Sequence, residues 1–259
     1  MRFVLIHGGF HGAWCWDRTI PELERLGHEA IAIDLPGHGR RVDEESRHDL
    51  RREAIVSVLE PGDVLVGHSG GGYDITLGAA GASQLVSHLV YLAAGLPLEG
   101  HSILEATGGK AEESEDGELE VKQLMTDETG MLQFIRPNAD GRLECIDFQG
   151  AWDFFYHDCD EATARWAYEQ LSPGPHASYS LEPVSVPRYW EANLPRSYIL
   201  CLRDRAKPHA MSVEVARRLG VEPIPIDTSH SPFLSRPAEL AELLVYATTT
   251  EPTGPLIPD

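Results

Sequence analysis

The residues best suited to chemistry lie in one stretch of the chain, residues 63–72. It contains the pattern Gly-x-Ser-x-Gly, with Ser69 at its centre. A Val-rich run before Ser69 is typical of a buried strand, and residues 73–80 are typical of a helix. A serine in a tight strand–turn–helix connection holds its hydroxyl above the edge of a sheet, where it can act as a nucleophile. A chance match is the alternative in a chain with 24 glycines, but chance would not also supply both flanking elements.

A serine hydroxyl needs a base to act as a nucleophile at neutral pH, and the base needs an acid that orients it. In this kind of site the chain order is Ser, then Asp or Glu, then His. Asp204 directly follows the apolar run at residues 198–203, and His230 lies between the last apolar run and the last predicted helix. We therefore predict a catalytic triad of Ser69, His230 and Asp204.

Other acids and histidines fit this order less well. Asp34 precedes Ser69 in the chain, and Asp227 lies in a loop whose backbone it could bond instead. His7 is expected to bond backbone groups of its own loop, and His68 to point away from the nucleophile. Five further histidines are interpreted as surface or structural residues: His28, His48, His88, His101 and His176.

An oxyanion hole is expected beside Ser69, formed by two backbone N–H groups. One comes from Gly70, which follows the serine, and the other from the first loop, where Gly9 is favoured over Phe10. The same loop is expected to bring Phe10 and His11 to the substrate pocket. No metal-ligand spacing is present, and the glycines after the strand lack the lysine of a phosphate-binding loop. We therefore expect neither a metal nor a cofactor.

The composition is that of a globular protein with an acidic surface. The 259 residues include 41 acidic and 21 basic ones, for a formal net charge of −20. Nucleic acids and anionic membrane surfaces repel such a charge, so we expect neither as a partner. The sequence shows no Cys-x-x-Cys spacing, no signal peptide and no apolar run of membrane-spanning length. We expect a cytoplasmic protein, a monomer or a homodimer, that acts on a small molecule.

Strands and helices alternate along most of the chain, which predicts a mostly parallel, doubly wound α/β sheet. Besides the run before Ser69, strands are predicted at residues 3–6, 28–34, 85–94, 197–202 and 221–226. Besides the helix after Ser69, helices are predicted at residues 14–26, 47–59 and 212–219 and from Pro237 onward. Because the carboxyl ends of parallel strands meet at one edge of a sheet, this arrangement would bring the three predicted catalytic residues together.

The alternation stops between residues 96 and 196, which we interpret as a cap over this edge of the sheet. A helix is predicted at residues 161–171, with Asp160 as its N-cap. The aromatic residues of the cap are expected either to form the wall of the pocket or to pack the cap on the core. The wall candidates are Trp152, Phe154, Phe155, Tyr156 and Trp190.

The chain is thus divided into a core, a cap and a tail. The core comprises residues 1–95 and 197–247, and the cap residues 96–196. Within the cap, the acidic stretch at residues 112–118 is expected to be an exposed loop. Residues 248–259 are rich in Thr and Pro, which predicts a disordered tail.

Several stretches together match a known pattern. They are residues 3–16, which include His-Gly-Gly-Phe-His-Gly-Ala-Trp, residues 33–39, the serine motif, residues 198–204 and the loop of His230. They resemble the α/β-hydrolase superfamily, in the branch of plant-type methylesterases and hydroxynitrile lyases. The resemblance covers the core, about residues 1–95 and 197–245, and implies an α/β-hydrolase fold. It does not cover the cap, which we expect to be an inserted and mainly helical segment. It also implies the triad and the two oxyanion amides already named.

Two positions depart from the lyases of this branch, which carry Thr after the first-loop His and Lys after the catalytic His. Here these positions are Gly8 and Ser231, which offer neither group to a cyanohydrin or a cyanide ion. A Ser nucleophile in place of Asp also disfavours haloalkane dehalogenase and epoxide hydrolase chemistry. We expect a serine hydrolase that cleaves a carboxylic ester or lactone with an apolar or aromatic moiety through an acyl-enzyme. The alternatives are a carbon–carbon bond hydrolase with the same triad and a ligand-binding receptor on a hydrolase fold.

Overall fold

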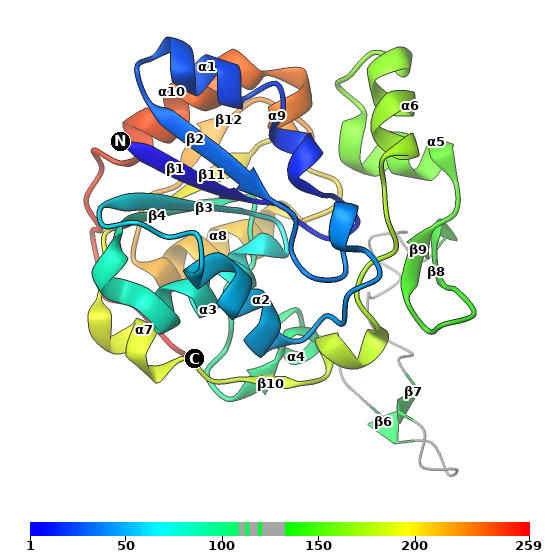
Figure 1. Cartoon of the computed structure of the whole chain (residues 1–259), viewed down its shortest axis with the longest axis horizontal. Helices are drawn as coiled ribbons and strands as arrows, with labels where there is room; N and C mark the ends of the chain where they lie inside the picture. Colours follow the sequence, from blue (N-terminus) through cyan, green and yellow to red (C-terminus); the bar gives the residue numbers. More distant parts are fainter. Residues whose placement is uncertain (109–111, 114–118, 121–132) are drawn as a thin grey trace.

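The fold is built on a central sheet of six parallel strands (Figure 1). The computed structural model describes residues 1–108, 112–113, 119–120 and 133–259. The strand order is β12-β11-β4-β3-β1-β2. The strands are β1 (Arg2–Ile6), β2 (Glu29–Ile33), β3 (Asp63–His68), β4 (Val86–Leu92), β11 (Arg196–Cys201) and β12 (Ile224–Ile226). This confirms the predicted α/β class and the parallel, doubly wound sheet.

Both faces of the sheet are buried, which explains why its strands read as continuous apolar runs. Successive side chains of a strand point to opposite faces. In β1, Phe3 and Leu5 therefore join one core cluster, whereas Val4 and Ile6 join the other. The last strand, β12, is shorter than predicted and lies at the edge of the sheet. Pro225 has no N–H group, and a proline is tolerated in an edge strand because that strand has a neighbour on one side only.

Helices cover both faces of the sheet. They are α1 (Ile20–Arg25), α2 (His48–Val56), α3 (Gly71–Ala82), α8 (His209–Leu219), α9 (Pro232–Ser235) and α10 (Pro237–Ala247). Figure 1 shows α1 and α10 on one side of the sheet and α2, α3 and α8 on the other. The first predicted helix is split into a 3-10 turn, Ala13–Trp16, and α1, because Pro21 fits only the first turn of a helix. Within the described residues, no helix is long and apolar enough to cross a membrane.

The segment between β4 and β11 divides into two parts. Four elements pack against the core: β5 (His101–Ser102), α4 (Ile103–Ala106), β10 (Pro183–Val184) and α7 (Pro187–Ala192). The others form the cap on the right of Figure 1: β8 (Ile135–Pro137), β9 (Leu143–Cys145), α5 (Phe148–Ala151), the π-helix Trp152–Tyr156 and α6 (Glu161–Glu169). Two further short strands are β6 (Glu112–Glu113) and β7 (Leu119–Glu120); residues 114–118 of the acidic stretch lie outside the described residues. Asp160 caps α6 as predicted, because its carboxylate accepts the N–H of Thr163 at 2.8 Å.

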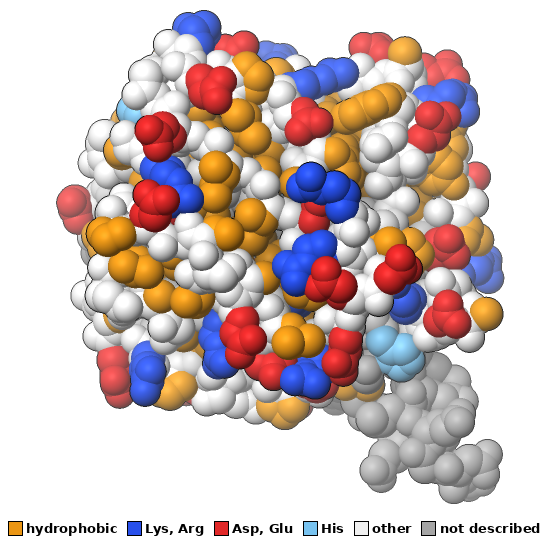
Figure 2. Space-filling model, viewed as in Figure 1, with side chains coloured by type: hydrophobic (Ala, Val, Ile, Leu, Met, Phe, Trp, Pro, Cys, Tyr) orange, Lys and Arg blue, Asp and Glu red, His pale blue; other side chains and the backbone are white. Residues whose placement is uncertain are grey.

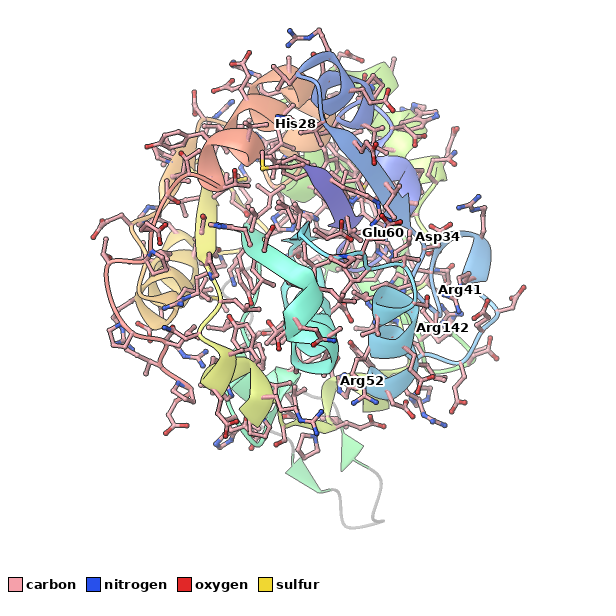
Figure 3. The ribbon with its side chains drawn as sticks, turned by 60° about the vertical axis from the view of Figure 1, so that its left-hand side comes forward. His28, Asp34, Arg41, Arg52, Glu60 and Arg142 are labelled. Carbon is pink, nitrogen blue, oxygen red and sulfur yellow. The ribbon has the colours of Figure 1, made fainter. Side chains whose placement is uncertain are left out.

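One arginine docks the cap on the core. Arg142, between β8 and β9, donates to the carbonyl oxygens of Gly37 at 2.6 Å and Val42 at 2.8 Å. In Figure 3 it lies beside Arg41 and Asp34, on the side of the molecule where the loop after β2 leaves the sheet. The cap is therefore hydrogen-bonded to a loop that begins at the carboxyl edge of the sheet.

The C-terminal segment differs from the expected disordered tail. The N–H groups of Thr253 and Gly254 donate to the carbonyl of Gly220 at 2.8 and 2.9 Å, and that of Ile257 donates to Arg218. These carbonyls lie at the end of α8, where the last turn of a helix leaves its acceptors without partners. The segment satisfies them and lies along the core.

Charged side chains are dispersed over the surface. Figure 2 shows acidic side chains interspersed with basic ones across one face rather than gathered in a single patch. Several form pairs between near neighbours in the chain, such as Arg41 with Glu44 and Arg217 with Glu214. Exposed pairs of this kind contribute about 0–1 kcal/mol, so they affect solubility more than stability.

Four histidines are fully buried near the carboxyl ends of the strands. They are His7, His11, His38 and His68. The Nδ1–H of His7 donates to the carbonyl of Gly8 at 2.8 Å, and its Nε2 accepts the N–H of Leu35 at 3.1 Å, which joins the loops after β1 and β2. Burial lowers the pKa of His7 to about 4 and that of His11 to about 3. Burial also lowers the pKa values of His38 and His68, so all four rings are neutral at pH 7.

Acidification should therefore destabilise the fold between pH 7 and pH 5. The unfolded chain protonates His7 and His11 near pH 6.5, whereas the folded protein does so only near pH 4 and pH 3. The stability that each provides is complete above pH 6.5 and decreases by about 1 kcal/mol per pH unit as the pH falls toward the folded-state pKa. Urea denaturation should give a lower free energy of unfolding at pH 5 than at pH 7. The His11→Gln variant should show a shallower dependence, and equal stability of the wild type at both pH values would contradict this prediction.

Candidate active site

Ser69 occupies a sharp turn between β3 and α3, with its backbone in the left-handed region at a φ of 52°. A Cβ on Gly67 would lie 2.5 Å from the carbonyl oxygen of Gly71, and one on Gly71 would lie 2.6 Å from that of His7. Both positions therefore require glycine. The N–H of Ser69 donates to the carbonyl of Leu92 at the end of β4 at 3.1 Å. A strained backbone of this kind costs about 1–3 kcal/mol and persists because the neighbouring strands hold it in place.

The loop after β1 lies beside this turn because β1 and β3 are neighbours in the sheet. The chain proceeds from β1 to β2 toward one edge and from β3 to β4 toward the other, and such a reversal leaves a crevice for ligands. An ideal Cβ on Gly70 would lie 3.6 Å from the nitrogen of Gly9, so the two predicted oxyanion amides are close together. Neither N–H has a backbone hydrogen-bond partner among the described residues. Phe10, with a φ of 65°, turns the loop onward toward the cap.

His11 links this first loop to the cap. Its Nδ1–H donates to the carbonyl of Gly9 at 2.8 Å, so its Nε2 accepts the hydroxyl of Tyr156 at 2.7 Å. A Cβ on Gly8 would lie 2.8 Å from the Cβ of Ser69, which shows how closely the loop approaches the serine turn. The first loop is thus held between Tyr156 of the cap on one side and the turn of Ser69 on the other.

His230 and Asp204 follow β12 and β11 and form a buried pair. The Nδ1 of His230 lies 2.6 Å from Oδ2 of Asp204. The other carboxylate oxygen accepts the N–H groups of Ala206 at 2.8 Å and Lys207 at 2.9 Å. These contacts orient the carboxylate and place the ring proton on Nδ1. Nε2 then remains available as a base, and His230 lines the same cavity as Ser69.

The rival acids have other partners. Asp34 accepts the N–H of Ala13 at 2.7 Å and pairs with Arg40 at 2.8 Å. Asp227 is paired with Arg203 at 2.8 Å on the surface. Both carboxylates therefore hold neighbouring segments of the chain together.

A cavity of about 260 Å³ lies over Ser69 and His230. Its apolar wall comprises Phe10, Ile103, Leu143, Phe155, Pro175 and Ala206. The volume is just below the range of about 300–1,000 Å³ that is usual for ligand pockets. The cavity therefore suits a small molecule with an apolar body.

Another part of the cavity wall is polar. Arg51 binds both carboxylate oxygens of Asp74, each at 2.7 Å, and the hydroxyl of Tyr179 donates to the same carboxylate at 3.3 Å. A further nitrogen of Arg51 lies 3.1 Å from Nδ1 of His38. Arg51 and Asp74 are only 3% and 1% exposed. Their charges compensate each other, so this wall is polar but has no net charge.

Of the five cap aromatics predicted to form the pocket wall, Phe155 alone lines the cavity. Trp152 packs on Phe148 with ring centroids 5.5 Å apart, and Phe154 packs on Phe134 with centroids 5.0 Å apart. These two residues hold the cap together. Side chains that follow one another around a helical turn point in different directions, so a single one faces the cavity.

The remaining two candidates also lie elsewhere. Tyr156 is buried behind His11, with its hydroxyl on that ring. Trp190 lies on α7 and donates its Nε1–H to Glu99 at 2.5 Å. The expectation that Trp152, Phe154, Tyr156 and Trp190 form the pocket wall is corrected accordingly. From the first loop, Phe10 and His11 do line the cavity.

Several wall residues were not identified from the sequence. They are Arg51, Asp74, Ile103, Leu143, Pro175 and Tyr179. They come from α2, α3, α4, β9 and the connection after α6, which are far apart in the chain. One available signal was Asp74, the single charged residue in the otherwise apolar and small-residue helix α3. Within the described part of the chain, no three His, Cys, Asp or Glu side chains are grouped to hold a metal ion.

The chain matches a known protein family over most of its length. The model of the alpha/beta hydrolase family matches residues 3–243. Methylesterase 1 of Arabidopsis thaliana is 26% identical over 264 residues, covering 93% of each chain. Polyneuridine aldehyde esterase of Rauvolfia serpentina is 27% identical over 257 residues, covering 94% of each chain.

Solved structures agree in fold. An extracellular alpha/beta-hydrolase from a Paenibacillus species superposes with a TM-score of 0.76 at 23% identity, over 96% of this chain and 100% of that chain. The similarity therefore extends over the sheet and the cap. The chain belongs to the alpha/beta hydrolase family, and the two relatives named above are plant esterases to which it is similar.

Proposed function

We propose that the protein is a serine esterase in which Ser69, His230 and Asp204 act as a catalytic triad. The observation that carries this proposal is the buried 2.6 Å pair of His230 and Asp204, beside the cavity that holds Ser69 in its strained turn. An imidazole oriented by a carboxylate is the base that a serine nucleophile requires. Two relatives that match over more than nine-tenths of their length, methylesterase 1 and polyneuridine aldehyde esterase, are named as esterases, which supports the reaction class.

The reaction would proceed in two halves. Oγ of Ser69 forms a bond to the ester carbonyl carbon while Nε2 of His230 accepts the hydroxyl proton. The N–H groups of Gly9 and Gly70 would stabilise the negative charge that develops on the carbonyl oxygen. The bond to the alcohol oxygen then breaks, and the alcohol leaves with the proton from His230. Water attacks the acyl-enzyme by the same route and releases the acid.

The cavity supports a small, neutral ester or lactone with an apolar or aromatic moiety. Phe155 and the other apolar walls would contact that moiety. A charged substituent would lose its hydration against the polar wall without gaining a partner, because Arg51 and Asp74 already neutralise each other. The methylesterase name of one relative favours methanol as the leaving alcohol.

Cyanohydrin cleavage fits this site less well. Gly8 has no hydroxyl, and any Cβ there would lie 2.8 Å from that of Ser69, so a larger residue would displace the loop or the serine. Ser231 is fully buried and carries no charge with which to bind a cyanide ion. Hydrolysis is therefore favoured over lyase chemistry.

The Ser69→Ala variant should lose at least about 10⁴-fold in kcat/KM for an aryl acetate, because it removes the nucleophile of the proposed triad. The measurement is initial-rate kinetics on folded protein, with circular dichroism to confirm the fold. A fluorophosphonate reagent should label the wild type at Ser69 and leave the variant unlabelled. Exposed Ser57 supplies the control, since Ser57→Ala should retain wild-type activity. Retention of more than a few per cent of activity by Ser69→Ala would refute the proposed mechanism.

Phe155 and Phe154 provide a matched pair for testing the pocket. The Phe155→Ala variant should change the ratio of kcat/KM between a phenyl and an ethyl ester by about tenfold, because it removes an apolar contact with the substrate. The Phe154→Ala variant should lower the melting temperature and leave that ratio unchanged, because its ring packs on Phe134. If the ratio of kcat/KM between the two esters were the same in both variants, the proposal that Phe155 contacts the substrate would be wrong.

A third measurement concerns the chemistry that the site disfavours. The enzyme should hydrolyse an aryl acetate and release no cyanide from mandelonitrile above the rate in buffer. The physical reason is that Ser231 offers no charge to the departing cyanide, and Arg51 in the cavity wall is already paired with Asp74. Cyanide release above the buffer rate that disappears in Ser69→Ala would overturn the esterase assignment.

A further inference from the structure

One turn of the cap contacts the first loop and the loops of the proposed base and acid. It comprises the last two residues of the π-helix and the two that follow, residues 155–158. Phe155 lines the cavity, and Tyr156 reaches the first loop through His11. His157 and Asp158 each bond the residue that precedes a member of the proposed triad, as described below. We call residues 155–158 the coupling turn.

Asp158 binds the loop of the proposed base. Its Oδ2 accepts the N–H of Ser229 at 2.9 Å, and its Oδ1 lies 2.5 Å from the hydroxyl of the same residue. That hydroxyl also lies 3.0 Å from the carbonyl oxygen of Phe155. The Asp158 side chain is 5% exposed. Because Ser229 directly precedes His230, these contacts fix the backbone on which the imidazole is carried.

The other side of the same loop is held by the core. The Nε2–H of His68, next to Ser69, donates to the carbonyl of His230 at 2.8 Å. The imidazole is thus carried by a backbone held between the serine turn on one side and the coupling turn on the other. Removal of either contact would free the ring to move relative to Ser69.

The loop of the proposed acid is attached to the same turn. The Nε2–H of His157 donates to the carbonyl of Arg203, which directly precedes Asp204, at 2.8 Å. The guanidinium of Arg203 also lies 3.6 Å from Oδ2 of Asp158. The acid and the base are therefore positioned against one common element.

Docking of the cap alone does not account for this arrangement. Arg142 already attaches the cap to the core through the loop after β2, away from the proposed triad. Asp158, by contrast, places a buried carboxylate against Ser229. A buried carboxylate loses its hydration, so its position is favourable only where it accepts such hydrogen bonds.

We propose that Asp158 is a positioning residue for His230, which makes the cap a part of the catalytic centre rather than only a cover over it. This inference rests on the proposed function, since it assigns His230 as the base. Asp158 does not line the cavity, so its loss should leave substrate binding intact. A displacement of about 1 Å in a catalytic group can cost about 100-fold in rate. Loss of Asp158 should therefore lower kcat and leave KM nearly unchanged.

The test compares Asp158→Ala, Asp158→Asn, Ser229→Ala and the double variant Asp158→Ala/Ser229→Ala in the 259-residue chain. Asp160→Ala is the matched control, because that aspartate caps α6 two residues away and does not contact the loop of His230. The readouts are kcat and KM for an aryl acetate, the rate of fluorophosphonate labelling at Ser69, and the melting temperature.

Asp158→Ala should lower kcat and the labelling rate together, by about 10- to 100-fold, with KM within threefold of the wild type. Asp158→Asn should lose less, because its side-chain oxygen can still accept the N–H of Ser229. The double variant should lose no more than the larger single effect, because the contact between Asp158 and the Ser229 hydroxyl is already lost in Asp158→Ala. Asp160→Ala should lower the melting temperature with kcat within twofold of the wild type.

A kcat within threefold of the wild type in folded Asp158→Ala would overturn the inference. Additive losses in the double variant would also overturn it. Should Asp158→Ala fail to fold, Asp158→Asn and Ser229→Ala decide the matter: unchanged kcat in both would likewise overturn it. The proposed function is tested separately by labelling and turnover of the wild type, so an inactive wild type would refute that function, whereas an active wild type with indifferent variants would refute only the role of Asp158.

Discussion

The structure depends on the turn at Ser69, where backbone strain and close packing meet. A serine with a φ of 52° is stable only if the chain on both sides is held firmly. Here β3 leads in from the middle of the sheet, α3 leads out, and the end of β4 bonds the serine N–H. Gly67 and Gly71 allow the backbones to approach to distances that any Cβ would prevent. The loop after β1 therefore lies directly beside the serine.

Burial around this turn also determines which side chains of the site are charged. Histidines such as His7 and His11 are kept neutral by loss of hydration, so they act as hydrogen-bonding links between loops. Arg51 and Asp74 are charged, but each compensates the other across α2 and α3. The cavity therefore has an apolar wall and a polar wall that carries no net charge. Such surroundings favour a neutral substrate, in agreement with the proposed ester or lactone.

The cap is joined to the core at two sites, and the two would have different effects on the proposed catalytic centre. Arg142 joins it to the loop after β2, where the contact determines where the cap lies. The coupling turn joins it to the loops of His230 and Asp204, where small displacements would alter the alignment of the proposed base. Under these proposals, substrate selection through Phe155 and the geometry of the base would depend on the same four residues. Changes in the cap during evolution would be constrained by this link.

The sequence by itself determined the sheet, its parallel order and the edge at which the site lies. Apolar runs and the Gly-x-Ser-x-Gly turn are local signals, and chain order alone predicted that Ser69, Asp204 and His230 would meet. Only the tertiary structure decided which of residues 152–156 faces the cavity, because the direction of each side chain depends on how the π-helix is rotated against the core. It also decided that Arg51, Asp74 and Tyr179 share one wall, and that the C-terminal segment bonds the end of α8 through residues 253–257. These contacts join segments far apart in the chain, and no local pattern encodes them because their free energy arises only when the segments are packed together.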